Sequence, residues 1–171
     1  MARGRAPGAK RSFGFEKLKI FDSDLWRKIK NQKSEAAASP KPLQIFGSDH
    51  DPRVLGDARR NIAAAGVDRW VKLEQADILD RAAPAPAGVM IANPPYGERI
   101  GSKEELAEFY PKLGSALKKN YPGWRCHFFT ADMRLPKLMR LQPSRRVPLF
   151  NGAIECRLFE IAIVAGSNRK P

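Results

Sequence analysis

The alternation of short apolar stretches with amphipathic stretches constrains the fold of this chain more than any other feature. The strand-like stretches are residues 43–47, 71–75, 88–92, 124–130 and 153–165, and the helix-like stretches between them are residues 53–66, 103–119 and 132–140. Strands that alternate with helices in this way form a parallel sheet with helices on both faces. The sequence therefore predicts an α/β fold with a mostly parallel sheet, formed by residues 43–171.

The first 42 residues differ in composition from the rest of the chain. Residues 1–33 hold ten Lys and Arg residues against three acids, and the charges are interrupted by Phe13, Phe15, Leu18, Trp26 and Ile29. A basic tail is the simplest interpretation, because chain termini are commonly poorly ordered. A solvated tail would not contain so many large apolar residues, however. We therefore expect residues 1–42 to form a basic segment, with a short helix over 24–31, that packs on the domain of residues 43–171.

The overall charge and the cysteine content exclude several classes of protein. The chain has 31 Lys and Arg residues against 18 acids, a formal net charge of +13, which favours nucleic acid or an anionic membrane surface as a partner. No apolar run approaches the roughly 20 residues that cross a bilayer. Two cysteines, Cys126 and Cys156, form neither a disulfide framework nor a four-ligand zinc site. We expect a soluble cytoplasmic protein without a metal centre, in which both thiols are reduced packing residues.

Polar side chains end three consecutive strands of the predicted sheet, at Asp49, Asp77 and Asn93. Ligands of such sheets bind at the carboxyl ends of the strands. An acid at the end of the first β-α unit commonly holds a pair of ribose hydroxyls, and we favour Asp49 for this role, with Asp51 as the rival; either could instead cap the next helix. Asp77 could accept from an adenine amino group, with Ile78 contributing its backbone N–H and an apolar wall.

The most informative stretch is Asn93-Pro94-Pro95-Tyr96, which directly follows a buried strand. The exocyclic amine of a nucleobase is a poor nucleophile, because its lone pair is delocalised into the ring. Two acceptors on its N–H groups, the Asn93 side-chain oxygen and the Pro94 carbonyl, would hold the amine and favour a localised lone pair. The two prolines fix the turn rigidly, and Tyr96 offers a face for an extruded base. The alternative is a stiff strand-to-helix turn with no chemical role.

Basic residues recur on the side of the predicted site. They are Arg99, Arg140, Arg145 and Arg146, which precede Asn151-Gly152. Solvation explains most such residues, but their position after strand ends predicts contact with a nucleic-acid backbone. His50 and His127 lack metal-ligand spacing, and we expect His127 to lie in or near the core.

Several motifs are informative in combination. They are Arg5-Ala6-Pro7-Gly8, Phe13-Gly14-Phe15-Glu16-Lys17, Gly47-Ser48-Asp49-His50-Asp51, Ile91-Ala92-Asn93-Pro94-Pro95-Tyr96-Gly97-Glu98-Arg99 and Asn151-Gly152-Ala153-Ile154-Glu155-Cys156-Arg157-Leu158. Together they resemble the methyltransferase domain of the THUMP-containing RNA guanine-N2 methyltransferases, the RlmL-like large-subunit rRNA type, formerly described as adenine-specific DNA methylases. The resemblance covers almost the whole chain.

The resemblance implies a class I Rossmann-like methyltransferase that uses S-adenosylmethionine and acts on guanine N2 of 23S ribosomal RNA. It implies that Asn93, Pro94 and Tyr96 serve the target base, that Asp49 serves the ribose of the cofactor and that Asp77 serves its adenine.

The sequence departs from the family pattern at its start. The family's glycine-rich first loop, an Asp-Pro-x-Cys-Gly-Ser-Gly-Thr type of sequence, is absent from the 171 residues, and so are the strand before it and the THUMP domain. We therefore expect the chain to be the C-terminal part of a longer enzyme, with weak or no cofactor binding and no activity alone. The lost central strand could be compensated by direct pairing of 43–47 with 88–92, or by a strand from a partner.

Two other functions compete with guanine-N2 methylation. Adenine-N6 methylation of DNA or RNA would use the same turn, since either exocyclic amine fits it. A non-catalytic basic module could bind RNA through residues 1–33 and the region of Arg140 to Arg146.

Overall fold

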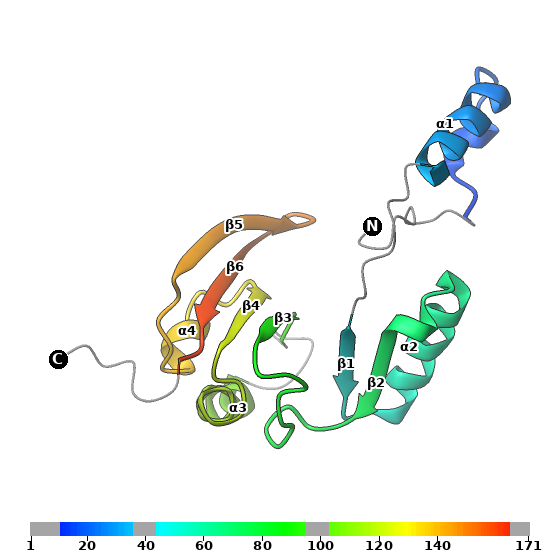
Figure 1. Ribbon diagram of the computed structural model, residues 1–171. Helices are drawn as coiled ribbons and strands as arrows, with labels where there is room; N and C mark the ends of the chain where they lie inside the picture. Colours follow the sequence, from blue (N-terminus) through cyan, green and yellow to red (C-terminus); the bar gives the residue numbers. More distant parts are fainter. Residues whose placement is uncertain (1–10, 36–43, 95–102, 165–171) are drawn as a thin grey trace. The chain divides into compact units, whose positions relative to one another are not determined.

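The computed structural model describes residues 11–35, 44–94 and 103–164, and the chain divides into two compact units, Met1–Gln44 and Ile45–Pro171 (Figure 1). Pro95, Tyr96 and Arg99 lie outside the described residues. None of the helices in the described part combines the length and apolarity that a bilayer crossing requires.

The first unit contains a 3-10 turn, η1 (Gly14–Lys17), and helix α1 (Ser23–Glu35). The Asp22 carboxylate accepts hydrogen bonds from two backbone N–H groups at the start of α1, and the helix extends further in both directions than the expected 24–31. Phe13 and Phe15 pack edge-on against Trp26 of α1, with ring centroids 6.0 and 5.1 Å away. The aromatic residues of the basic segment therefore form a small cluster of their own. Whether residues 1–42 pack on the remaining chain stays a prediction.

The second unit begins with a two-stranded parallel sheet. Its elements are β1 (Ile45–Asp49), α2 (Pro52–Ala65), the 3-10 turn η2 (Asp68–Trp70) and β2 (Val71–Gln75). The Asp51 side chain caps α2, Pro52 occupies its first turn, and Gly66 ends it with a φ of 63°. These are the start and stop signals that the sequence offers. The first strand begins at Ile45 instead of residue 43, which makes Asp49 its last residue.

The larger sheet has four strands in the order β3-β4-β6-β5. They are β3 (Gly88–Ala92), β4 (Trp124–Thr130), β5 (Arg145–Asn151) and β6 (Ile154–Ala162); β3 runs parallel to β4, while β6 runs antiparallel to both β4 and β5. The predicted α/β class is confirmed. The sequence predicts a mostly parallel sheet, whereas the described strands form two parallel pairs, β1 with β2 and β3 with β4, and two antiparallel pairs, β4 with β6 and β5 with β6. Strand β5 was not predicted, because two arginines and Pro148 break the apolar pattern. Proline is compatible with an edge strand, which is where β5 lies.

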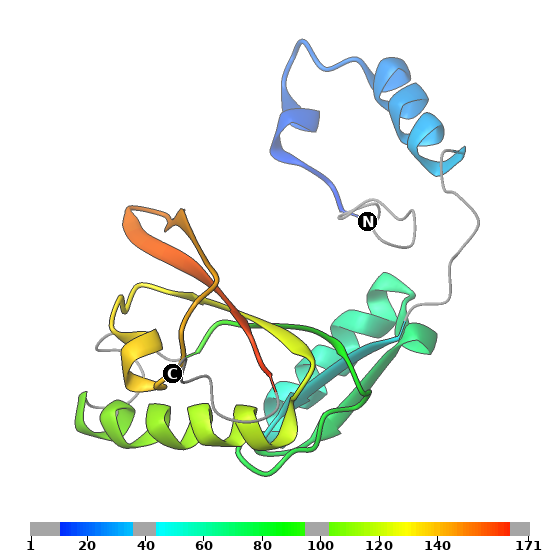
Figure 2. The same ribbon diagram turned by 60° about the vertical axis from the view of Figure 1, so that its left-hand side comes forward.

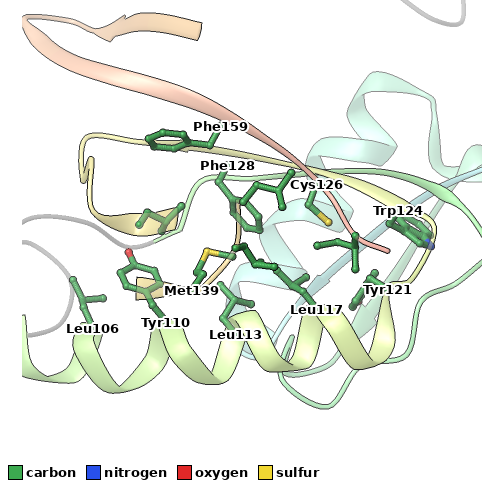
Figure 3. Packing of buried hydrophobic residues seen from close by; sticks show 14 residues of the cluster. Leu106, Tyr110, Leu113, Leu117, Tyr121, Trp124, Cys126, Phe128, Met139 and Phe159 are labelled. Carbon is green, nitrogen blue, oxygen red and sulfur yellow. The ribbon is translucent and has the colours of Figure 1, made fainter. Parts of the chain in front are cut away.

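Helix α3 (Lys103–Asn120) and the short helix α4 (Leu135–Leu138) cover one face of the larger sheet (Figure 2). The core lies between them and the strands (Figure 3). Tyr110 and Leu117 of α3 are completely buried there, together with Tyr121 just after the helix, Cys126 of β4 and Ile161 of β6. A helix is expected over 132–140, but α4 spans only the four residues Leu135–Leu138. Its Leu135 is part of the core.

The two sheets share no strand pairing in the part of the chain that the structure describes. Strand β1 pairs with β2, and β3 pairs with β4, so each has one edge without a partner strand there. The direct pairing of the first and third strands that the sequence allowed is not formed. Three hydrogen bonds anchor the segment between β2 and β3, which links the sheets. Trp124 Nε1 donates to the Ala85 carbonyl at 2.9 Å. The Asn120 side-chain nitrogen donates to the Leu79 carbonyl, and the Asn120 carbonyl accepts from the Ala83 N–H.

We expect Gly114→Ala to destabilise the fold. A Cβ placed on Gly114 of α3 would overlap the backbone carbonyl of Met139, so α3 and α4 would have to move apart. Such overpacking costs about 2–3 kcal/mol. Urea denaturation followed by circular dichroism measures the loss.

Gly56→Ala is the matched control, since Gly56 also lies inside a helix. A Cβ there meets only the end of the Arg60 side chain, at 3.6 Å. Alanine is favoured over glycine in a helix by about 0.5–1 kcal/mol. A Gly114→Ala protein as stable as the Gly56→Ala protein would contradict the packing described here.

Candidate active site

The carboxyl edge of the smaller sheet brings Asp49 and Asp77 together. Asp49 pairs in register with Gln75, and Asp77 follows two residues further on. The Gln75 side-chain nitrogen donates to the His50 carbonyl at 3.1 Å and so ties the ends of the two strands. Sequence reasoning missed Gln75, although a polar residue that ends the strand beside Asp49 was a usable signal.

The two rival acids after β1 have different surroundings. The Asp51 carboxylate accepts from the backbone N–H and from the guanidinium of Arg53, at 2.8–3.2 Å. The side-chain hydrogen bond from Arg53, helped by the backbone one, lowers the pKa of Asp51. Asp51 is therefore occupied as the cap of α2.

Asp49 has more capacity left for a ligand. One of its carboxylate oxygens accepts from the Asp51 N–H at 2.8 Å, and the His50 ring nitrogen lies 3.6 Å from the same oxygen. Its side chain is 36% exposed. The second oxygen has no hydrogen bond to the described residues and can accept from a hydroxyl group.

Asp77 forms the turn after β2. One of its carboxylate oxygens accepts from the Leu79 N–H at 2.8 Å, and its backbone carbonyl accepts from Asp80 and Arg81. The side chain itself is exposed, so its other oxygen faces solvent. Ile78 is half-buried and packs against the core, which fixes the turn.

The carboxyl end of β3 presents the first half of the predicted base-binding turn. Asn93 is exposed, and Pro94 behind it is buried. Ala92, the last residue of β3, packs against the core cluster and pairs in register with Phe128 of β4. The start of the turn is thus held by the core of the larger sheet. Asp49 ends a strand of the smaller sheet, and Asp77 lies in the link that follows it, whose Ile78 packs against the core of the larger sheet.

The predicted nucleic-acid residues lie in the region from α4 to the β5–β6 turn. Arg140 is exposed with a φ of 53°, and its carbonyl accepts from the Lys118 ammonium at 3.1 Å. Arg145 and Arg146 are exposed at the start of β5, and Asn151 ends that strand. Their contact with nucleic acid remains a prediction.

The histidines and cysteines have structural surroundings. The Nε2 atom of His127 lies 3.6 Å from Glu160, which also pairs with Arg125 at 3.4 Å, while His50 is exposed. Both cysteines are free and buried, as the sequence predicted. Burial raises the pKa of Cys126 to about 12.

Comparisons of this chain with known proteins all find methyltransferases. Residues 1–160 match the model of the RMKL-like methyltransferase domain. A protein of Shewanella baltica named "Ribosomal RNA large subunit methyltransferase K/L" is 38% identical over 99% of this chain, and one of Shewanella frigidimarina with the same name is 35% identical. The chain spans about a quarter of the length of these relatives, 24% in each case.

Solved structures show the same fold. The protein SMU.472, described as "a putative methyltransferase complexed with SAH", superposes with a TM-score of 0.82 at 28% identity, covering 96% of this chain and 44% of that one. A Listeria monocytogenes protein described as a predicted N6-adenine-specific DNA methylase gives a TM-score of 0.78 at 25% identity, covering 94% and 41%. The architecture is that of Rossmann-like methyltransferases.

We expect the native chain to resist thiol reagents at pH 8. Because burial raises the pKa of Cys126 to about 12, its thiol stays protonated through the alkaline range in which free thiols ionise, with only ~10⁻⁴ of it as thiolate at pH 8. A colorimetric disulfide reagent should label neither cysteine in buffer and both in guanidinium chloride. Stoichiometric labelling of the native chain would show that the core is open to solvent.

Proposed function

The chain belongs to the RMKL-like methyltransferase domain family, and on that premise we propose that it forms the base-methylating part of a large-subunit rRNA methyltransferase. The cofactor would be S-adenosylmethionine and the acceptor guanine N2. The relatives named as rRNA large subunit methyltransferases support the substrate class, and the neighbour complexed with SAH supports the cofactor.

The observation that supports this proposal most is that the Asp49 and Asp51 carboxylates have different hydrogen-bond partners. Asp51 is occupied by the cap of α2 and by Arg53, while Asp49, at the carboxyl end of β1, keeps an acceptor oxygen available. A carboxylate at this position of a Rossmann-like unit binds ribose hydroxyls. The residues present therefore fit the nucleoside half of the cofactor.

The turn after β2 fits the adenine of the cofactor. The exposed oxygen of Asp77 is an acceptor for the adenine amino group, and the turn is held rigid by the Leu79 N–H and by the packing of Ile78. When bound, S-adenosylmethionine supplies the methyl group that the amine attacks in line, with no covalent enzyme intermediate.

The acceptor base would be held by the turn that begins at Asn93. The exposed Asn93 side chain and the Pro94 carbonyl accept from the two N–H groups of the amine, and Tyr96 stacks on the base. The amine nitrogen would gain the methyl group and release one of its two protons to solvent. The residues orient the amine, and orientation is the main contribution that they make to the rate.

Adenine-N6 methylation is the second candidate. The turn serves either amine, and the Listeria monocytogenes neighbour is described as a predicted adenine-specific methylase. The names of the curated relatives favour RNA over DNA. A base analysis of the methylated product separates the two, since N6-methyladenine would contradict the guanine proposal.

The cofactor affinity of this chain alone should be low. The 171 residues contain no glycine-rich loop of the family type, and β1 and β3 have no common neighbour strand among the described residues. Isothermal titration with S-adenosylmethionine should give a dissociation constant much weaker than micromolar, and we expect no turnover at micromolar cofactor. A micromolar dissociation constant would contradict this expectation.

Asp49→Ala should affect cofactor binding, whereas Asp51→Ala should affect the stability of the fold. Loss of the Asp49 carboxylate removes the ribose acceptor, so the weak cofactor signal in ligand-observed NMR at millimolar concentration should vanish, with little change in melting temperature. Loss of Asp51 removes the α2 cap and should lower the melting temperature while the signal persists. The reverse pattern would assign the ribose role to Asp51.

The proposal as a whole is tested by the coupling between cofactor and RNA. The affinity for an unmodified transcript of large-subunit rRNA is measured by filter binding with and without millimolar S-adenosylmethionine. A methyltransferase that assembles both ligands at one site should bind RNA more tightly with the cofactor. A non-catalytic basic module would bind the transcript equally in both conditions, and that result would overturn the proposal.

A further inference from the structure

The β5–β6 hairpin extends beyond the edge of the sheet at which the target base would bind. Strand β4 makes its last pair with β6 at Thr130 and Arg157, so residues 149–156 reach past the end of β4. Three residues in each strand correspond to an overhang of about 10 Å. Because β3 runs parallel to β4, this is also the edge at which Asn93 follows β3 (Figures 1 and 2).

The overhanging tip is unusually apolar for an exposed segment. Phe150 is 69% exposed, Ile154 is 52% exposed and Leu149 is 39% exposed. The turn between the strands is tight, since Gly152 adopts a φ of 62° and Asn151 pairs with Ile154. A flat aromatic ring is therefore presented on a short, rigid hairpin.

The segment that leads into the tip is basic, and its cations precede the tip: Arg145 and Arg146 begin β5, opposite Glu160 and Phe159. From residue 131 to residue 157 there are six basic side chains against two acids. Both acids are in ion pairs, Asp132 with Arg134 at 2.9 Å and Glu155 with Arg157 at 2.7 Å. The four remaining cations form no ion pair with the described residues: Lys137, Arg140, Arg145 and Arg146. The surplus charge complements a polyanion.

We propose that the hairpin tip contacts the RNA next to the target nucleotide, with Phe150 stacking on a base that the extrusion of the target leaves unstacked. An enzyme that acts on an exocyclic amine takes its target base out of the stack, and the neighbouring bases lose a stacking partner. An aromatic side chain can replace that partner, irrespective of sequence. Ile154 and Leu149 widen the apolar surface around the ring. This inference rests on the proposed RNA substrate.

The apolar tip could instead bind a second copy of the chain. RNA is favoured because the tip projects from the same edge as Asn93 and because residues 131–157 hold four cations without an ion pair to the described residues, which attract a polyanion and repel a second copy of the chain. Repulsion between like charges opposes such a dimer.

The test compares variants of Phe150 for binding to the unmodified transcript of large-subunit rRNA. Phe150→Ala removes the ring and should raise the dissociation constant about tenfold, in line with the loss of one stacked base. Phe150→Leu should recover part of the affinity, and Phe150→Trp should bind like the wild type with a change in tryptophan emission on RNA addition. Val54→Ala is the control, because Val54 is an apolar residue of α2 that is 48% exposed.

The outcomes are distinguishable. Equal binding by the wild type, Phe150→Ala and Val54→Ala would overturn the role of the hairpin and leave the proposed function intact. No binding of RNA by the wild type would overturn both. A wild-type dimer in sedimentation that Phe150→Ala converts to a monomer, with unchanged RNA binding, would assign the tip to self-association and overturn the inference. Equal melting temperatures of all variants verify that exposed positions were changed without unfolding.

Discussion

The packing of α3 against the larger sheet is the interaction on which the rest of the second unit depends. Tyr110 and Leu117 of α3, and Tyr121 just after it, are completely buried (Figure 3). Gly114 allows the backbone of Met139, at the end of α4, to approach the helix closely. This core holds β3 on one side of β4 and β6 on the other. The turn after β3 and the β5–β6 hairpin are therefore positioned by the same core, although 60 residues of sequence separate Asn93 from Ala153.

The sequence predicted those strands that have a clear apolar or alternating pattern of their own. The observed bounds of β2, β3 and β4 are those expected, because each is a short apolar or alternating run between turn residues. Strand β5 was missed because its formation depends on pairing with β6 and not on its own pattern, since two arginines and Pro148 lie within it. The boundary of β1 moved by two residues for a similar reason: its register is set by β2.

The candidate site was predicted in part. Strand ends identified Asp49, Asp77 and Asn93, but the choice between Asp49 and Asp51 could not be made from spacing, because both patterns are common after a first strand. The hydrogen bonds of Asp51 to Arg53 favour Asp49. Gln75 was missed because its role depends on the register that places it opposite Asp49. The resemblance to a family identified the chemistry, which neither charge nor periodicity could do.

The separation of the two sheets gives a physical reason for the low cofactor affinity that we expect of this chain. Asp49 ends the smaller sheet and Asp77 follows its second strand, whereas Asn93 follows a strand of the larger sheet, and no strand pairing joins the sheets in the described residues. A ligand that needs both edges binds only those conformations in which the edges are correctly aligned, so its apparent affinity falls by the fraction of molecules that are aligned. The hydrogen bonds of Trp124 to Ala85 and of Asn120 to Leu79 connect the larger sheet and its helix to the segment that links the two sheets. By the same linkage, a ligand that contacts both edges stabilises their alignment, and RNA bound to the larger sheet would then bind more tightly in its presence.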